Sequence, residues 1–392
     1  MSQGSNVRSA AFAIAMIFIG LLALPSSLSQ ELAHGIDQAS DLDEIYNMSL
    51  EELLEVDIQT GRPGWFGTQL GQLKVKPYIH GYGVFDYRDY DLNRRKEVET
   101  FDMHYFNVLV GANVEDRIAA EVLLEYEHGG DDTGVRYGLL DYKLYDWLMI
   151  RMGKFLVPMG RFNEYLSPEY ANKLPDRPYC LWRIVPIVWA ETGLQLRGQY
   201  RPKGLPTLNY AVYVVNGLEQ ASGDGGDIRD MRGNNRDTHN NNKAIGGRIG
   251  FKTDWGLEGG FSYYRGAYTI DGDEYLSIMD LDAEYARYKW TFRGEYVSAV
   301  QEAVAGDLHK HGFYAEAAYR IDRHLEPVVR YDQAYMDDGS GNILKRTTFG
   351  LVFYPYPTLH PLFNFRVSQS IVHNDGRGDQ THEFVIQCVL GF

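Results

Sequence analysis

The residue types that could do chemistry in this chain fall into three small groups, two of which would bind metal ions. Segments 271–273 (Asp-Gly-Asp) and 337–339 (Asp-Asp-Gly) resemble parts of calcium loops, but neither completes the spacing of an EF-hand or its final Glu. His309 and His311 share one side of an expected strand start, and the sequence suggests no third ligand for them. We therefore predict no metal site and no cofactor.

The third group is the serine and histidine pair that a barrel lipase would use. Ser368 or Ser370 could pair with His373, but such a pair must face lipid, and both serines fall on the expected polar face of their strand. No nucleophile elbow occurs in the sequence either. We predict that the protein is not an enzyme.

Charged side chains recur instead at every second position of short segments whose intervening positions are apolar. In 191–200, Glu191 and Arg197 fall on one side, while Leu194 and Leu196 fall on the other. A period of two is that of a β-strand, because successive side chains point to opposite faces. The sequence thus predicts strands with one charged face and one apolar face.

The C-terminal segment, 382–392, has the most regular alternation. The residues on its apolar face are Phe384, Ile386, Cys388, Leu390 and Phe392. Its length matches the roughly 9–11 residues with which a barrel strand crosses a bilayer. A chain ending on an aromatic residue behind alternating apolar positions resembles the assembly signal of bacterial outer-membrane barrels. That resemblance implies recognition of Phe392 by the barrel-assembly machinery; an edge strand of a soluble sheet is the alternative.

The N-terminal end has the pattern of an exported protein. Arg8 precedes an uncharged apolar run, 10–24, and small residues follow it, which predicts a signal peptide over 1–29. A single transmembrane anchor is the alternative, but the run is shorter than the roughly 20 residues that a span needs. We expect 30–72 to be a periplasmic segment with one amphipathic helix over 41–56, and 73–392 to be the barrel.

Composition and charge restrict the partners. The formal net charge is −15, and it becomes −16 when Arg8 leaves with the signal peptide. Since an acidic exported chain binds phosphate backbones poorly, we expect no nucleic acid partner. Hydrophobic residues make up only 44% of the chain, with 29 Tyr, which suits a barrel that is apolar on one face and aromatic at the membrane interfaces. Cys180 and Cys388 are far apart, so we expect no disulfide.

Sixteen segments after residue 73 are strand-like, an even number as bacterial barrels require. They are 78–87, 105–114, 117–127, 139–145, 148–155, 191–200, 208–215, 245–252, 257–264, 280–285, 290–298, 313–321, 325–332, 347–354, 363–371 and 382–392. Short connections such as 146–147 and 322–324 would face the periplasm, and the long stretch 217–243 would face outside. Because no open sheet edge can face hydrocarbon, we predict an all-β, transmembrane antiparallel β-barrel of about 16 strands. A secreted soluble β-sheet binding protein is the alternative class.

One connection, between Lys154 and Trp189, is rich in Pro and aromatic residues and too apolar for a free external loop. We expect it to fold into the barrel and narrow the pore. Its charged residues would form the constriction: Arg161, Glu164, Glu169, Lys173, Asp176, Arg177 and Arg183. Charged residues on the polar strand faces would line the pore: Arg151, Arg197, Arg248, Arg293, Glu295, Arg320, Arg330 and Asp332. For each residue the alternative is a salt-bridged wall group that stiffens the barrel.

Four segments resemble the phosphate-selective porin O and P family. They are Met152–Phe162 (MGKFLVPMGRF), Val214–Gly217 (VVNG), Gly312–Asp332 (GFYAEAAYRIDRHLEPVVRYD) and Thr347–Pro357 (TTFGLVFYPYP). The resemblance spans most of 73–392. It implies a trimeric pore in the outer membrane of a Gram-negative-type bacterium, in contact with outer-membrane lipid and lipopolysaccharide.

Phosphate selectivity does not carry over with the resemblance. The pores of that family have stacked basic residues and a lysine cluster, whereas acidic and basic residues are mixed here. Mixed walls orient dipolar solutes and discriminate weakly between ions. We therefore predict a porin for passive diffusion of small ions and polar solutes. The alternative is an anion- or phosphate-selective, or substrate-specific, porin with a basic lining of Arg161, Lys173, Arg177 and Arg197.

Overall fold

The computed structural model describes residues 75–93, 95–220, 228–232, 243–337 and 342–392. The predicted signal peptide and the predicted helix over 41–56 lie outside these residues. The chain divides into two units, 1–78 and 79–392, and apart from residues 75–78 the structure described below belongs to the second. Among the described residues, no helix is both long enough and apolar enough to cross a membrane.

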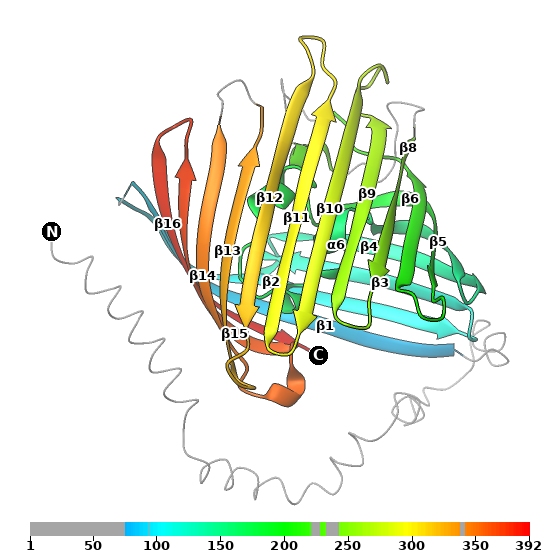
Figure 1. The fold of residues 1–392 in the computed structure, drawn as a ribbon, viewed down its shortest axis with the longest axis horizontal. Coiled ribbons are helices and arrows are strands. Elements are labelled where there is room, and N and C mark those ends of the chain that lie inside the picture. Colours follow the sequence, from blue (N-terminus) through cyan, green and yellow to red (C-terminus); the bar gives the residue numbers. More distant parts are fainter. Residues whose placement is uncertain (1–74, 94, 221–227, 233–242, 338–341) are drawn as a thin grey trace, which may run out of the picture. The chain divides into compact units, whose positions relative to one another are not determined.

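Sixteen antiparallel strands close into a barrel in which each strand pairs with its neighbours in sequence (Figure 1). The strands are β1 (Val75–Leu92), β2 (Arg95–Val114), β3 (Ile118–Glu127), β4 (Asp132–Tyr145), β5 (Leu148–Leu156), β6 (Ala190–Tyr200), β7 (Thr207–Val215), β8 (Ala244–Lys252), β9 (Leu257–Ala267), β10 (Tyr275–Arg287), β11 (Trp290–Gln301), β12 (Leu308–Tyr319), β13 (Leu325–Tyr335), β14 (Ile343–Phe353), β15 (Phe363–Asn374) and β16 (Asp379–Gly391). The all-β barrel predicted from the sequence is confirmed, and each predicted segment matches one strand.

Several strands are longer than the alternation predicted. Strand β2 begins at Arg95 rather than 105, and β10 begins at Tyr275 rather than 280. The added residues of β2 include Glu97 and Glu99, which break the apolar alternation but still form strand. Backbone pairing can continue beyond the apolar band of a barrel, where side chains need not match hydrocarbon.

The C-terminal strand closes the barrel against β1. Tyr82 pairs with Gly391 and Phe85 with Cys388. The last residue also takes part, since the Phe392 N–H donates to the Gly81 carbonyl at 2.9 Å and the Gly81 N–H donates to the Phe392 carbonyl at 2.8 Å. Closure gives the edge strands hydrogen-bond partners, which a barrel in hydrocarbon requires.

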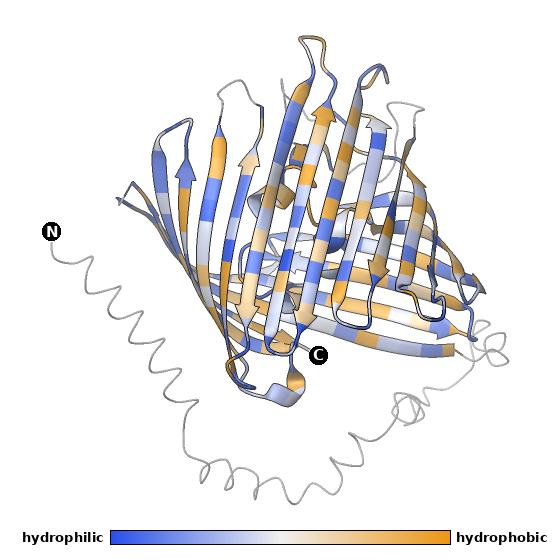
Figure 2. Ribbon diagram, in the orientation of Figure 1, coloured by the Kyte–Doolittle hydropathy of each residue, from blue (hydrophilic) through white to orange (hydrophobic). Residues whose placement is uncertain are grey.

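The two faces of the wall differ as the sequence predicted. In β13, Glu326, Arg330 and Asp332 are buried inside, while Val329 and Tyr331 are exposed outside. Figure 2 shows the resulting alternation of hydrophilic and hydrophobic bands along the strands. A soluble sheet would bury its apolar face, so an apolar exterior around a charged interior indicates contact with hydrocarbon.

The barrel has two distinct ends. At the turn end, each even-numbered strand is connected to the odd-numbered strand that follows it, as β2 is to β3 and β4 is to β5. The C-terminus lies at the same end. At the loop end lie the longer connections after β5 and β7. Exposed aromatic side chains gather close to the turn end: Tyr145, Trp147, Tyr200, Trp255, Tyr288 and Trp290. Such a girdle is typical of a membrane interface.

The connection after β5, residues 157–189, lies inside the barrel and is called the inward segment below. It contains α6 (Gly160–Tyr165), η2 (Glu169–Ala171) and α7 (Tyr179–Arg183). Helix α6 contacts β9 and β10, and α7 contacts β12 and β13. The apolar side chains of the inward segment, including Phe162, Leu181 and Ile184, are buried in a cluster with Val297 and Tyr314 of the wall. The predicted inward loop is therefore confirmed.

The other short helices lie in connections. They are η1 (His128–Gly130), η3 (Ile228–Met231) and η4 (Pro357–Leu359). Ile228 and Met231 of η3 join the same buried cluster as the inward segment. The apolar core therefore lies inside the barrel, where the inward segment packs against residues of β4, β5 and β7–β13, and not between two sheets.

Candidate functional site: the cavities beside the inward segment

Four cavities lie beside the inward segment, and residues of this segment line each of them. A cavity of about 380 Å³, here called the central cavity, lies against β1–β5. Tyr82, Glu125 and Arg136 line it from the wall, and Tyr170 and Arg177 line it from the inward segment. The cavity reaches Leu362 and Phe392 and so extends to the turn end.

Two further cavities border the central cavity toward the loop end. The loop-end cavity, of about 260 Å³, is lined by Arg136, Lys154 and Arg232 and shares Glu125, Arg136 and Val188 with the central cavity. The side cavity, of about 300 Å³, shares Arg177 with the central cavity. Arg136 and Arg177 thus stand where neighbouring cavities meet.

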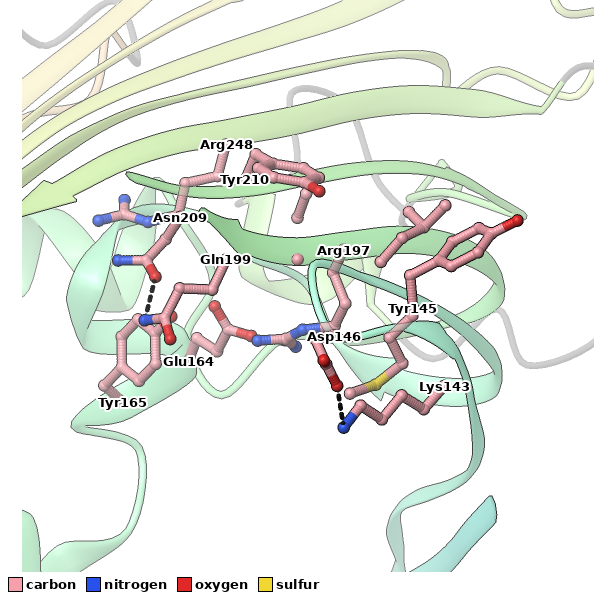
Figure 3. A pocket seen from close by; sticks show the side chains of 14 residues that line it. Lys143, Tyr145, Asp146, Glu164, Tyr165, Arg197, Gln199, Asn209, Tyr210 and Arg248 are labelled. Carbon is pink, nitrogen blue, oxygen red and sulfur yellow. Dashed lines mark hydrogen bonds and ion pairs between the residues drawn. The ribbon is translucent and has the colours of Figure 1, made fainter. Parts of the chain in front are cut away.

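A fourth cavity, of about 290 Å³, opens near the turn end and is shown in Figure 3. Glu164 of the inward segment lines both this cavity and the central cavity. Across the fourth cavity Arg197 Nη1 donates to Glu164 Oε1 at 2.6 Å. Arg248 also lines it and is paired with Asp282.

Arg136 is fixed by partners on three sides. Its guanidinium bonds both carboxylate oxygens of Glu125, and Nη2 donates to Glu127 Oε1 at 3.0 Å. Nη1 donates to the carbonyl of Val188 at 3.3 Å, which ties β4 to the end of the inward segment. A guanidinium held by two carboxylates keeps its orientation, as a group lining a passage requires.

Arg177 is held in a comparable way from the other side. Nη1 donates to the Tyr105 hydroxyl at 3.0 Å, and Nη2 lies 2.6 Å from Glu169 Oε1. The guanidinium also lies over the rings of Tyr105 and Trp182, with 5.5 and 5.8 Å to their centroids. This residue was among those predicted for the constriction.

Most of the other predicted constriction residues form ion pairs, chiefly with the wall. Arg161 Nη1 lies 2.5 Å from Glu258, and its Nη2 lies 3.2 Å from Glu284. Lys173 Nζ lies 2.6 Å from Glu326 Oε1. The remaining pairs are Glu164 with Arg197, Asp176 with Arg88, and Glu169 with Arg177. Arg183 ends α7 and is partly buried. The structure therefore joins these residues to separate strands and does not gather them into one ring.

Most of the predicted pore-lining residues form ion pairs with other charged residues of the wall. The pairs are Arg151 with Asp141, Arg248 with Asp282, Arg293 with Glu316, Arg320 with Glu326, and Asp332 with both Arg330 and Arg346. Arg293, Glu295, Arg330 and Asp332 are buried, and they line none of the four cavities. Their positions therefore agree with the alternative hypothesis, in which such residues are wall groups that stiffen the barrel.

Sequence reasoning missed Arg136, Lys154 and Arg232. The register between β3 and β4 shifts so that Leu123 faces Tyr137 and Leu124 faces Val135, which leaves Arg136 as the extra residue of a β-bulge. A bulge turns a side chain out of the period-two pattern, so a period-two analysis cannot place Arg136 inside. The alternation therefore predicted no strand over residues 132–138, although Arg136 in this range lines two of the cavities.

Comparisons with known proteins agree with this architecture. No family model matches the chain. An uncharacterized protein of Aquifex aeolicus (strain VF5) is 27% identical over 331 residues, which are 73% of this chain and 74% of that protein. Among solved structures, the anion-selective porin from Comamonas acidovorans aligns with a TM-score of 0.60 at 12% identity, covering 81% of this chain and 100% of that one.

Two other outer-membrane proteins align over a similar length. The channel DcaP of Acinetobacter baumannii gives a TM-score of 0.56 at 11% identity, covering 81% of this chain and 97% of that one. The trimer form of OmpT from Vibrio cholerae gives 0.51 at 12% identity, covering 81% and 99%. Identities this low establish the fold alone. The chain has the general fold of bacterial outer-membrane porins.

Proposed function

We propose that the protein is an outer-membrane porin for passive diffusion of small ions and polar solutes. One observation carries the proposal: the central cavity shares Arg136 with the loop-end cavity and Arg177 with the side cavity, and the linings of the three cavities together run from the loop end to the turn end. The apolar exterior and the porin fold support a membrane location. No covalent step is needed, because exclusion by size and the field of the walls do the selecting.

The same proposal includes orientation and assembly. The turn end, with the C-terminal Phe392, faces the periplasm, as the short turns of outer-membrane barrels do. The barrel-assembly machinery recognises Phe392, and lipid and lipopolysaccharide surround the wall. A homotrimer is supported by the trimer form of OmpT, which shares the fold. The mass of the detergent-solubilised protein tests this part, and a monomer would contradict it.

Conductance in planar lipid bilayers tests the channel itself. The refolded mature chain should produce discrete current steps, and the steps should scale with bulk salt conductivity, since the path is filled with water. A chain that inserts into the bilayer and leaves it silent would contradict the proposal. Refolding is checked independently by the altered electrophoretic mobility of unheated samples.

A preference for anions is the second candidate, and the loop-end cavity favours it. Arg136, Lys154 and Arg232 line this cavity, and Glu125 is the one acid among the described residues of its lining. Burial, followed by the nearby charge of Arg177, lowers the pKa of Arg232. Burial, then the charges of Arg232 and Arg177, likewise lower the pKa of Arg229. A bound anion would stabilise these crowded guanidiniums in their charged form.

Reversal potentials under a salt gradient decide between the two candidates. If the loop-end cavity selects anions, wild type should prefer anions, and Lys154→Glu/Arg232→Glu should shift the preference toward cations. Arg377→Glu is the matched control, because Arg377 is exposed in the β15–β16 connection and lines none of the four cavities. If the anion-to-cation permeability ratio of wild type were near unity, only the proposal of a general diffusion channel would stand.

A further inference from the structure

Two histidines and a carboxylate converge at the loop end, apart from the residues that line the central cavity. Asp102 and His104 belong to β2, and His128 is the first residue of η1. His104 Nδ1 lies 3.1 Å from Asp102 Oδ2, and His128 Nδ1 lies 2.8 Å from the same oxygen. All three potential ligand atoms lie within 4.8 Å of one another.

The fold creates this convergence from positions that the sequence separates. Strand β2 continues beyond the end of β3, because Tyr105 already pairs with Glu127, the last residue of β3. Asp102 and His104 therefore lie beside the connection that follows β3. His128 begins that connection in a left-handed conformation, with a φ of 50°. Its ring lies edge-on to the ring of His104, with 5.4 Å between the ring centroids.

More carboxylates surround the three groups. Asp86 Oδ2 lies 3.7 Å from His104 Nδ1, and the Asp86 side chain is fully buried. Arg88 holds Asp86 through a hydrogen bond from Nη2 at 2.7 Å. Glu127 and Asp132 form a second group with His128. Such acidic surroundings favour a divalent cation, and hydrogen-bonded carboxylates near a ligand histidine typically orient it.

The ligand types indicate which cation would bind. Two imidazole nitrogens and one carboxylate oxygen suit zinc and similar transition metals, whereas calcium and magnesium prefer oxygen ligands alone. Ligand bonds of about 2.0–2.2 Å in a tetrahedral site place ligand atoms roughly 3.3 Å apart, close to the separations around Asp102 Oδ2. The His128 side chain is 48% exposed and can adjust its position.

We propose that Asp102, His104 and His128 form a binding site for a zinc-class divalent cation. Three protein ligands leave a fourth position for water or for an anionic solute. His104 also lines the side cavity with Arg88 and Arg177, so the open position lies near a proposed route of solutes. The proposal does not depend on channel activity, because metal binding is measured on the folded chain alone.

Isothermal titration of the full mature chain in detergent with zinc chloride tests the site. Wild type should bind about one zinc ion per chain. Since even outer carboxylates contribute about 10–100-fold to metal affinity, Asp102→Asn should weaken binding by at least about tenfold. His104→Ala/His128→Ala should abolish the saturable phase. Calcium chloride should bind more weakly than zinc under the same conditions.

The control variant is His309→Ala/His311→Ala. It removes two exposed histidines from the loop end of β12 and leaves the cluster intact, so zinc binding should persist. His128→Ala alone changes an exposed side chain and keeps the test meaningful if the double variant does not refold. Absence of saturable binding, binding unchanged in the cluster variants, loss of binding in the control, or equal affinity for calcium would each overturn the proposal.

Discussion

Asp176 of the inward segment accepts a hydrogen bond from Arg88 of β1, with 2.8 Å between Oδ1 and Nη1. Helices α6 and α7 of the inward segment contact β9, β10, β12 and β13, and this ion pair joins the same segment to β1. Arg88 also bonds Asp86 through Nε and Nη2. The pair therefore braces the inward segment against β1 at the side cavity, which both residues line.

Asp176→Asn should release this brace and increase brief closures and current noise in single-channel recordings several-fold. The substitution removes the charge that ties the inward segment to β1 and leaves Arg88 paired with Asp86 of its own strand. The matched control is Asp146→Asn, because Asp146 and Lys143 form an exposed turn-end pair at 2.8 Å, which contributes little. Equal noise in the two variants would contradict a bracing role for Asp176.

The same pair predicts a pH dependence. Burial alone would raise the pKa of Asp176, but the charges of Arg88 and Arg346 hold it below its ordinary value of 3.8. Stabilisation by a carboxyl with a lowered pKa is complete above the ordinary value and is lost as the pH falls toward the folded-state pKa. Wild type should thus approach the noise of Asp176→Asn only below about pH 3.8. If the difference in current noise between wild type and Asp176→Asn disappeared near neutral pH, this role of the Asp176 carboxylate would be contradicted.

Gly160 should tolerate no side chain, for two separable reasons. Its φ is +63°, and an added Cβ would clash with Glu295 Oε2 and lie 2.8 Å from Asp280 Oδ2. Gly378 has a similar φ of +67°, but nothing lies within 4 Å of an added Cβ. Gly378→Ala should cost about 1 kcal/mol, and Gly160→Ala about 3 kcal/mol or more. Urea titration of folding into lipid vesicles measures both, and equal costs would show that the carboxylates do not confine α6.

Cys180 should resist polar thiol reagents. It is fully buried in α7, and burial, then the charge of Asp332, raises its pKa well above the ordinary value of 9.0. Thiolate is the reactive form, so alkaline pH should not speed its modification as it does for an exposed cysteine. In a Cys388→Ala background, Val304→Cys provides the exposed comparison, since Val304 is 99% exposed. Modification of Cys180 at a comparable rate would mean that α7 does not stay packed inside.

Lipid contact can be tested by one pair of substitutions. Val212 is 63% exposed on the outer face near the middle of β7, and Val304 is exposed in the β11–β12 connection. Arginine on the lipid face near the midplane costs about 2–4 kcal/mol, whereas a loop position in water costs little. Val212→Arg should therefore impair folding into vesicles and Val304→Arg should not. Equal folding of both variants would indicate that the outer face meets water.

The sequence predicted the barrel well because period-two alternation directly reports a wall with two different sides. Alternation locates Glu326, Arg330 and Asp332 on one face without any knowledge of their partners. It could not predict ion pairs such as Arg161 with Glu258 and Glu284, because these depend on how the inward segment packs against distant strands. The constriction residues were therefore identified as charged groups of the segment, but their pairing was not.

Two features escaped sequence analysis for local reasons. Arg136 faces the cavities only because the bulge in β4 interrupts the alternation. His104 and His128 meet only because of the register of β2 against β3 and the left-handed turn at His128. Spacing along the chain reveals neither feature, so a register or a structure is needed to find them.

The most direct test of the solute route uses Lys154, which lines the loop-end cavity and bonds only the Val135 carbonyl among its described hydrogen bonds. Lys154→Cys in a Cys180→Ala/Cys388→Ala background is recorded as single channels before and after a bulky, membrane-impermeant thiol reagent, with labelling verified by mass. The account predicts a clear stepwise loss of conductance, and no loss when Val304→Cys is labelled instead. Complete labelling at Lys154→Cys with unchanged current would contradict it.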